Sequence, residues 1–166
     1  MNDPLAVMTL KTPVGSLSLI SAGSTLVAAE FGDAGSLKSR LSLQLIERGF
    51  TNVKSILGVS DEVRRYFDGE LNAIDQIKVK QPGGAFSQSA WRAMRKIKPG
   101  AVISYSDLAS NSGSAAAVRA AGSACARNLI APIVPCHRII RSDGSLGGYG
   151  FGLPTKTWLL KHEGAY

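Results

Sequence analysis

A cysteine followed directly by a histidine, Cys136-His137, is the pair of residues in this sequence best suited to nucleophilic chemistry. Cysteine reacts as the thiolate, and a free thiol, with a pKa of about 8.5, is only slightly ionised at pH 7. An imidazole can take the thiol proton, and a carboxylate can orient that imidazole. Glu163 is the only acidic residue among the last twenty, so Cys136, His137 and Glu163 form the one candidate relay of the second half.

Adjacency creates a geometric difficulty for this relay. In an extended segment neighbouring side chains point to opposite faces, so His137 needs a bent backbone or a bridging water molecule to reach the sulfur of Cys136. Apolar residues on both sides, at Leu129–Val134 and Ile139–Ile140, indicate a buried strand or turn. Since a buried cysteine beside a histidine is more often structural than catalytic, the pair alone leaves both interpretations open.

The positive charge of the chain lies in its second half. Residues 1–83 contain nine Lys and Arg and nine Asp and Glu, which cancel, whereas residues 84–166 contain ten basic and three acidic residues. The second half therefore carries the whole net charge of +7, which favours a polyanionic partner such as nucleic acid. A basic surface that serves only solubility is the alternative.

Length and composition indicate a folded protein of one ordinary domain or two small ones. Of the 166 residues, 45% are hydrophobic and 19% are charged, so a buried core is expected. No apolar run reaches the roughly 20 residues that span a bilayer, and the N-terminus lacks the pattern of a signal peptide. With two cysteines, Cys125 and Cys136, and no close-spaced metal motif, we expect a cytoplasmic protein without a metal, a disulfide or a membrane partner.

Gln81-Pro82-Gly83-Gly84 is the best candidate for a domain boundary. We expect an N-terminal α/β domain at residues 1–80, a linker at 81–84 and a mostly helical domain at 85–166. The elements expected in the first domain are a hairpin formed by the strand containing Leu17 and Leu19 with Thr25–Phe31, a helix at Leu37–Ile46, a helix containing Val63, Tyr66 and Phe67, and a strand or extended linker at Ile74–Val79.

The second domain is expected to contain a helix-turn-helix. Ser104 and Asp107 resemble a capping box that opens a short helix, and Asn111-Ser112-Gly113 ends it. The next helix, Ala115–Ala126, consists largely of small residues and carries one long charged side chain near its start, Arg119. Small residues fit close packing against a core, and they also let a duplex approach the helix backbone. A further helix is expected at Phe86–Ile97, and a last helix that contains Lys156 and Trp158–Leu160 is expected to end near His162-Glu163-Gly164.

Ile133–Ile140, with Pro135-Cys136-His137-Arg138 at its centre, resembles the active-site signature of the O6-alkylguanine-DNA alkyltransferases, also called methylated-DNA–protein-cysteine methyltransferases. The similarity covers nearly all of residues 84–166. It is weaker in the first half, where Thr12-Pro13-Val14-Gly15 and Tyr66–Leu71 match. The other matching residues are Phe86, Trp91, Ser104-Tyr105, Val118-Arg119-Ala120, Asn128, Gly148-Tyr149-Gly150, and Lys156 with Trp158–Gly164.

The resemblance implies a ribonuclease-H-like N-terminal domain and a winged helix-turn-helix domain that binds the minor groove of double-stranded DNA and flips the damaged base into a pocket. It implies irreversible, single-turnover transfer of the alkyl group of O6-alkylguanine to Cys136, with no cofactor, by a protein that is a monomer in solution. Repair of O4-alkylthymine, preference for methyl or bulky adducts, and cooperativity on DNA stay open.

The resemblance also assigns roles to individual residues. Arg119 fills the place of the flipped base, Asn128 is a hinge between the recognition helix and the active-site segment, and Lys156 braces Cys136 and the following loop. The catalytic set is Cys136, His137, Glu163, Tyr105 and Lys156. The residues expected to contact DNA are Arg119, Tyr105, Ser104, Ala120, Gly122 and Arg138. The hinge and substrate pocket comprise Asn128, Pro135, Ile139, Tyr149, Gly150 and Phe151.

Three residues depart from the family pattern: Leu129 where proline is common, Cys125 where a larger side chain is frequent, and Phe151 where glycine is frequent. The bulk of Phe151 would narrow the pocket or supply a stacking wall. The main alternative is a non-catalytic, lesion-sensing or regulatory helix-turn-helix protein, which the presence of Cys136 disfavours. A Cys–His–Glu hydrolase is a further alternative, in which the helix-turn-helix would have no purpose.

Overall fold

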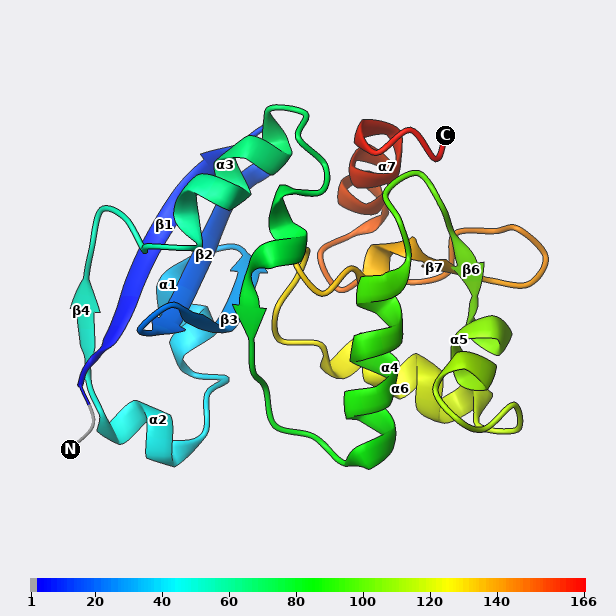
Figure 1. Cartoon of the computed structure of the whole chain (residues 1–166), viewed down its shortest axis with the longest axis horizontal. Helices are drawn as coiled ribbons and strands as arrows, with labels where there is room; N and C mark the ends of the chain where they lie inside the picture. Colours follow the sequence, from blue (N-terminus) through cyan, green and yellow to red (C-terminus); the bar gives the residue numbers. More distant parts are fainter. Residues whose placement is uncertain (1–2) are drawn as a thin grey trace. The chain divides into compact units, whose positions relative to one another are not determined.

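The computed structural model of the protein describes residues 3–166 and divides into two compact units. The first unit comprises the residues up to Gln81 together with Leu129–Ile133, and the second comprises Pro82–Asn128 and Val134–Tyr166. As expected from the sequence, the first unit mixes strands and helices and the second is mostly helical (Figure 1). None of the described helices is long and apolar enough to cross a membrane.

A five-stranded sheet organises the first unit (Figure 1). Its order is β4-β1-β2-β3-β5, in which β1, β2 and β3 are antiparallel neighbours and the short edge strands run parallel to theirs. The expected hairpin is confirmed, since Leu17 pairs with Phe31 and Leu19 with Ala29. The strands are β1 (Leu5–Thr12), β2 (Gly15–Ala22), β3 (Thr25–Phe31), β4 (Phe50–Asn52) and β5 (Lys78–Val79).

The prediction of a single helix over residues 37–46 is wrong. Two short helices, α1 (Ala34–Lys38) and α2 (Leu43–Glu47), occupy this stretch. Asp33 caps α1, and Ser42, which has an extended backbone, caps α2. A capping residue in extended conformation starts a new helix, so the apolar residues here are divided between two axes. The expected helix containing Val63, Tyr66 and Phe67 is confirmed as α3 (Ser60–Phe67). The 3-10 turn η1 (Ala73–Gln76) precedes β5.

Leu129–Ile133 belongs to the first unit, although the sequence predicted one continuous second domain from residue 85. Ala29 of β3 donates a hydrogen bond to the carbonyl of Leu129 (2.8 Å), and Ala131 donates to the carbonyl of Ala29 (3.1 Å). The buried N–H of Leu129 donates to Oε1 of Gln81 at 2.8 Å. The chain therefore crosses into the first unit and back immediately before Cys136, a path that an apolar run alone does not reveal.

Helices around a small apolar core form the second unit. Trp91 and Met94 of α4 are buried, and Nε1 of Trp91 donates to the carbonyl of Ala124 at 2.9 Å. The capping box at Ser104 and Asp107 is confirmed. The elements are α4 (Ala85–Lys96), β6 (Ile103–Ser104), α5 (Tyr105–Asn111), α6 (Val118–Arg127), η2 (Cys136–Arg138), β7 (Ile139–Ile140) and α7 (Leu153–His162).

The helix expected from Ala115 begins at Val118, as α6. Ala117 has φ −90° and ψ 42°, outside the helical range, and its N–H donates to the carbonyl of Ser114 at 3.0 Å. The tight turn after α5 thus takes up the first alanines. Helix propensity is a weak preference that such a tertiary constraint overrides.

Replacement of Gln81 by Met tests the attachment of Leu129–Ile133 to the first unit. Met has a similar length but no carbonyl oxygen, so the buried N–H of Leu129 would lose its acceptor, at a cost of about 1–3 kcal/mol. We expect the free energy of unfolding in urea to fall by that amount. The same change at the exposed Gln76 should alter it by less than about 0.5 kcal/mol, and equal losses would contradict this role of Gln81.

Candidate active site

Cys136, His137 and Arg138 form η2, a single 3-10 turn whose three side chains are buried. A 3-10 turn has three residues per turn, so adjacent side chains diverge by about 120° instead of pointing to opposite faces. The turn therefore supplies the bent backbone that the relay requires. All residues of the site described below belong to the second unit.

The carboxylate of Glu163 is shared by His137 and Arg138. Nε2 of His137 lies 2.8 Å from Oε2 of Glu163, while Nε and Nη2 of Arg138 donate to its Oε1 and Oε2 at 2.8 and 2.9 Å. Nη1 of Arg138 donates to the carbonyl of Ile97 at 2.7 Å. The three side chains are at most 4% exposed. A buried charge pair with this many hydrogen bonds fixes the position of every group in it.

This network sets the protonation states of its members. Burial acts to raise the pKa of Glu163, but hydrogen bonds from His137 and Arg138 outweigh burial and hold that pKa well below its usual range. Burial lowers the pKa of His137, and this effect outweighs the hydrogen bond and charge of Glu163; the positive charge of Arg138 lowers it further. The resting site therefore contains a carboxylate and a neutral imidazole.

The other ring nitrogen of His137 is the candidate base. Because Glu163 is a carboxylate, Nε2 carries the proton that is donated to it, and Nδ1 keeps its lone pair. Nδ1 is buried and has no hydrogen-bond partner among the described residues. Burial raises the pKa of the Cys136 thiol, although Asn128 and the charge of Lys156 act to lower it. At rest Cys136 is thus a neutral thiol, and the next residue carries a neutral acceptor.

Asn128 joins the end of α6 to the segment that carries Cys136. It is the C-cap residue of α6, and its side-chain amide donates to the carbonyl of Val134 at 2.7 Å. Asn128 is buried, and its side chain also hydrogen-bonds to the thiol of Cys136. This is the connection that the sequence predicted for a hinge residue, and Leu129 in place of proline leaves it intact.

Tyr105 lies beside the thiols and the glycine-rich loop. The parallel pairing of β6 with β7, in which Ser104 faces Ile140, brings the start of α5 next to η2. Burial raises the pKa of Tyr105, and the nearby Cys125 and Cys136 raise it further. A side chain at Gly147 would come within 3.0 Å of its hydroxyl. The phenol therefore stays protonated and can donate a hydrogen bond.

Lys156 of α7 holds the loop that follows β7. Its buried Nζ donates to the carbonyl of Ile139 at 2.7 Å, to that of Gly148 at 3.2 Å, and to that of Leu146. The three acceptors lie on β7 and on the loop, so one ammonium group fixes both. No carboxylate pairs with Lys156 among the described residues, and burial lowers its pKa.

Two aromatic rings continue from the imidazole toward the loop. The ring of Tyr149 lies edge-to-face with that of His137 at 6.4 Å between centroids, and with that of Phe151 at 5.4 Å. Gly150, between them, is exposed. Of the other expected pocket residues, Pro135 and Ile139 are buried, and Phe151 is half-buried. Phe151 therefore packs against Tyr149, and its expected place in the substrate pocket stays a prediction.

Three of the six expected DNA contacts, Arg119, Ala120 and Gly122, lie on α6. Arg119 and Ala120 are exposed and Gly122 is half-buried, whereas Ala121 and Ala124 face the core. The small residues therefore pack against the core on one side of α6, and on the other side few side chains project far from the helix backbone.

Arg138 is a correction to the expected DNA contacts. It is 1% exposed, and its guanidinium is engaged by Glu163 and Ile97, so it cannot reach a phosphate. Ser104 is half-buried, and its hydroxyl caps α5. In the sequence, Arg138 adjoins His137, and Glu163 is the only acid among the last twenty residues, but Asp143 lies nearer along the chain, so sequence alone does not single out the partner of Arg138. Among residues 3–166, no three His, Cys, Asp or Glu side chains are grouped as metal ligands.

The second unit matches a known domain. Residues 85–165 match the family model described as 6-O-methylguanine DNA methyltransferase, DNA binding domain. A methylated-DNA–protein-cysteine methyltransferase of Methanosarcina acetivorans is 35% identical over 155 residues, which cover 93% of this chain and 96% of that protein. Its counterpart in Shigella flexneri is 42% identical over 107 residues, and this match spans less than two thirds of either protein, 64% of this chain and 63% of the relative.

The fold is similar to that of solved relatives. The crystal structure of Mycobacterium tuberculosis OGT in complex with DNA is 31% identical to this chain, with a TM-score of 0.78, and the match covers 96% of this chain and 93% of that one. The sequence resemblance is confirmed by a relative that matches over nearly its whole length and by a structure that matches over both units. On these grounds the chain belongs to the methylated-DNA–protein-cysteine methyltransferase family.

Proposed function

We propose that this protein repairs O6-alkylguanine in double-stranded DNA by transferring the alkyl group to Cys136, once per molecule and irreversibly. The observation that carries the proposal is the buried relay in which Glu163 holds His137 with its Nδ1 atom unpartnered, one residue from a buried thiol. The names of the matched relatives and the DNA in the matched crystal structure support the substrate class.

The reaction balances with the groups present. Sγ of Cys136 attacks the alkyl carbon, the bond between that carbon and O6 of guanine breaks, and the bonding electrons stay on the base. The thiol proton passes to Nδ1 of His137 through a water molecule, and Glu163 stabilises the imidazolium. The guanine anion receives one proton, so the net change is the exchange of an alkyl group for a proton. The thioether is not reversed by thiols, which makes the protein a stoichiometric reagent.

A neutral thiol and a neutral imidazole suit this reaction because the alkylated guanine base that enters the site is itself uncharged. A site that kept a permanent thiolate would have to bury a negative charge before the base arrived, which is costly. Here charge separates only when the base is in place, and Asn128 and Lys156 favour the thiolate at that moment. Tyr105, as a protonated phenol, is placed to donate to the ring of the leaving guanine.

We further propose that α5 and α6 form the helix-turn-helix of a winged DNA-binding domain, with α6 in the minor groove. Support comes from the low outer surface of α6, the exposed Arg119 and the basic charge of the second half. The base must leave the stack because Cys136 is buried, and Arg119 would occupy the vacated place. The ribonuclease-H-like description of the first unit, O4-alkylthymine as a substrate and cooperative binding stay predictions.

Mass spectrometry of the reaction with a duplex containing one O6-methylguanine tests the function. We expect the peptide with Cys136 to gain the mass of one CH₂ group, with one methyl group transferred per protein molecule. Cys136→Ser should transfer none, while Cys125→Ser should still react. Methyl release to water, repeated turnover, or modification of Cys125 instead of Cys136 would contradict the proposal.

The dependence of the transfer rate on pH tests the relay. Since the pKa of His137 is lowered, its neutral form persists through the range near pH 6.5 in which a free histidine titrates, and the rate should stay constant there. Glu163→Gln removes the group that stabilises the imidazolium, and we expect a loss of about 100-fold or more in rate.

Arg138→Met is the matched control, because it breaks the same buried pair and keeps the carboxylate. Each variant should lower the free energy of unfolding, by about 3–5 kcal/mol. In Arg138→Met the pKa of His137 should rise, because the positive charge that lowers it is gone, so the rate should fall at a higher pH than in the wild type. If Glu163→Gln and Arg138→Met transferred the alkyl group equally slowly and with the wild-type pH profile, Glu163 would stabilise the fold but play no part in the reaction.

The ratio of benzyl to methyl transfer rates tests the wall formed by Tyr149 and Phe151. Phe151→Gly and Phe151→Ala both remove the ring that packs against Tyr149, and we expect both to change this ratio several-fold. Since Ala restricts the backbone more than Gly, agreement between them assigns the effect to bulk and not to loop flexibility. An unchanged ratio in both variants would show that Phe151 does not touch the adduct.

A further inference from the structure

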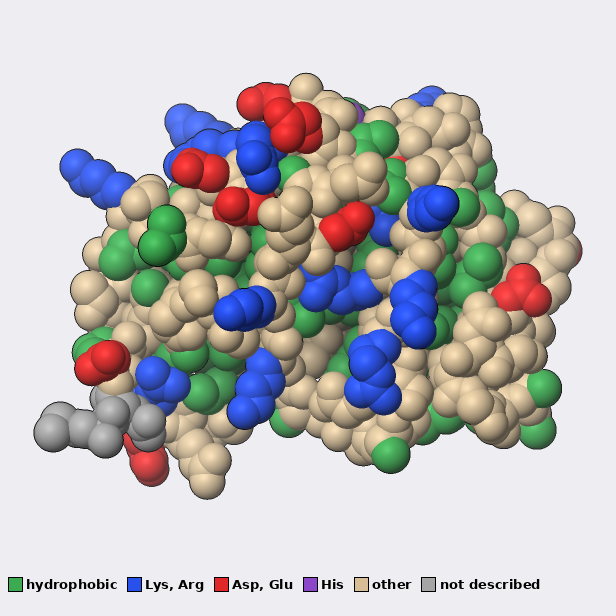
Figure 2. All heavy atoms as spheres, viewed as in Figure 1, with side chains coloured by type: hydrophobic (Ala, Val, Ile, Leu, Met, Phe, Trp, Pro, Cys, Tyr) green, Lys and Arg blue, Asp and Glu red, His purple; other side chains and the backbone are tan. Residues whose placement is uncertain are grey.

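Opposite its buried side, helix α4 has a polar face that the proposed reaction does not use. Ser89, Arg92, Ala93 and Lys96 recur at positions i, i+3, i+4 and i+7, so they share one side of the helix. The core side, which includes Trp91, faces elsewhere in the same unit. Figure 2 shows Lys and Arg side chains over α4 on the face in view.

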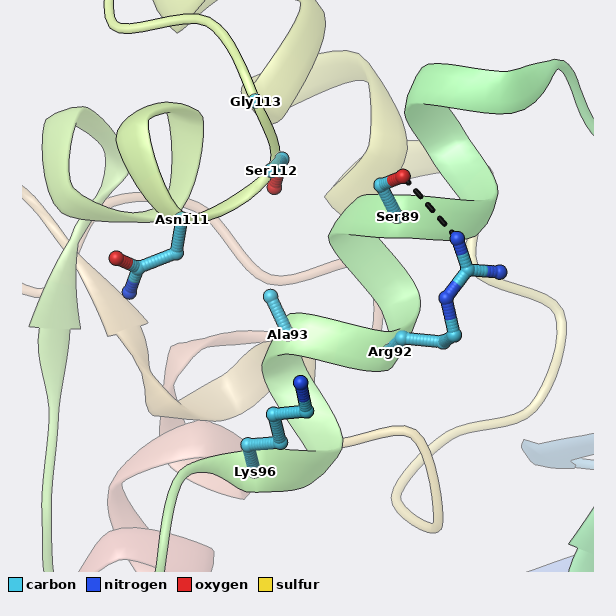
Figure 3. Close-up of a pocket in the computed structure, with 7 residues that line it drawn as sticks. All are labelled: Ser89, Arg92, Ala93, Lys96, Asn111, Ser112 and Gly113. Carbon is cyan, nitrogen blue, oxygen red and sulfur yellow. Dashed lines mark hydrogen bonds between the residues drawn. The ribbon is translucent and has the colours of Figure 1, made fainter.

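This face of α4 and the turn after α5 form the walls of an open cavity of about 490 Å³, lined by Ser89, Arg92, Ala93, Lys96 and residues 111–113 (Figure 3). In the figure, Ala93 points toward the turn and Lys96 extends along the helix beside the hollow. Nη2 of Arg92 donates to the hydroxyl of Ser89 at 3.2 Å, which steadies the guanidinium at the rim. The cavity lies wholly within the second unit.

The cavity is positively charged. Arg92 and Lys96 are exposed, and neither forms an ion pair with a carboxylate in the described part of the chain. None of the residues that line the cavity is acidic. Two cations beside polar hydroxyl and amide groups attract an anion, and the guanidinium can hold two oxygens of one phosphate.

Several carbonyl groups at the end of α5 accept hydrogen bonds from the turn that follows it. The carbonyl of Leu108 accepts from both N–H and Oγ of Ser112, and the carbonyl of Ser110 accepts from the N–H of Gly113. The side chains of Arg92, Lys96 and Asn111 are left to bind a ligand.

We propose that this cavity binds a phosphodiester group of the DNA backbone, on the same duplex that α6 contacts. The inference rests on the proposed function. The turn that forms one wall, Asn111–Gly113, leads within five residues to Val118, the first residue of α6, and α4 packs against both α5 and α6, so the cavity adjoins the helix that the proposed function places on DNA. The contact is independent of base sequence, and it extends the DNA-binding surface from α6 to α4.

The double variant Arg92→Gln/Lys96→Gln tests this site through the salt dependence of binding to an undamaged duplex. A phosphate contact contributes about 0.9 to the slope of log affinity against log salt, so we expect the slope to decrease by about 0.9 and the affinity to fall about 8-fold at 0.1 M salt. Because both side chains are exposed, the melting temperature should not change.

The double variant Lys98→Gln/Lys161→Gln removes the same charge from exposed positions outside the cavity. It should keep the wild-type slope, and an equal decrease in both double variants would overturn the site in favour of a general charge effect. Calorimetry with inorganic phosphate alone separates the sources of anion. Saturable binding to the wild type that Arg92→Gln/Lys96→Gln abolishes, with no change in the DNA slope, would show a free-anion site and overturn the proposal.

Alkyl transfer from the free base O6-benzylguanine needs no DNA, so it should proceed at the wild-type rate in Arg92→Gln/Lys96→Gln. If the wild-type protein transfers no alkyl group, but Arg92→Gln/Lys96→Gln shows the expected decrease in the salt-dependence slope, the proposed function is refuted and the cavity is still a DNA contact. A wild type that transfers normally with an unchanged slope in the variant would refute the cavity alone.

Discussion

The geometry of the site depends on one buried carboxylate that holds two groups of different kinds, a guanidinium cation and a neutral imidazole. Glu163 accepts two hydrogen bonds from Arg138 and one from His137. The guanidinium is permanently charged and balances the carboxylate, so the imidazole can stay neutral in a buried place. Without Arg138, the unbalanced carboxylate would draw a proton onto His137; without Glu163, the imidazole would have neither orientation nor a counter-ion.

The same turn is held from several directions by groups that are not themselves reactive. Asn128 ties it to the end of α6, the carbonyl of Ile97 ties Arg138 to the end of α4, and Lys156 ties β7 to the loop. A displacement of α6 would therefore be felt at Val134, two residues before the thiol. Under the proposed function, this hydrogen bond would connect contact of α6 with DNA to the position of Cys136.

Much of this protein could be read from residue types and spacing. The hairpin and the capping box at Ser104 follow from local rules, because turns and caps act over a few residues. The uneven charge and the Cys136–His137–Glu163 set follow from which residue types each part of the chain contains. The family resemblance added what local rules do not, such as the link from Asn128 to the active-site segment. Propensity failed where a cap or a turn interrupted it, at Ser42 and at Ala117.

The sequence by itself determined which groups are available: one relay, two thiols and a basic half. Only the tertiary structure decided what each group faces. Arg138, expected from its charge to contact DNA, is buried together with its partner Glu163, although the exposed Asp143 is nearer along the chain. Arg92 and Lys96, ordinary surface cations by sequence, line one cavity with a turn that follows a different helix. The reason is that a side chain's partners come from segments distant along the chain, and burial, which sets charge and reactivity, is a property of the packed whole.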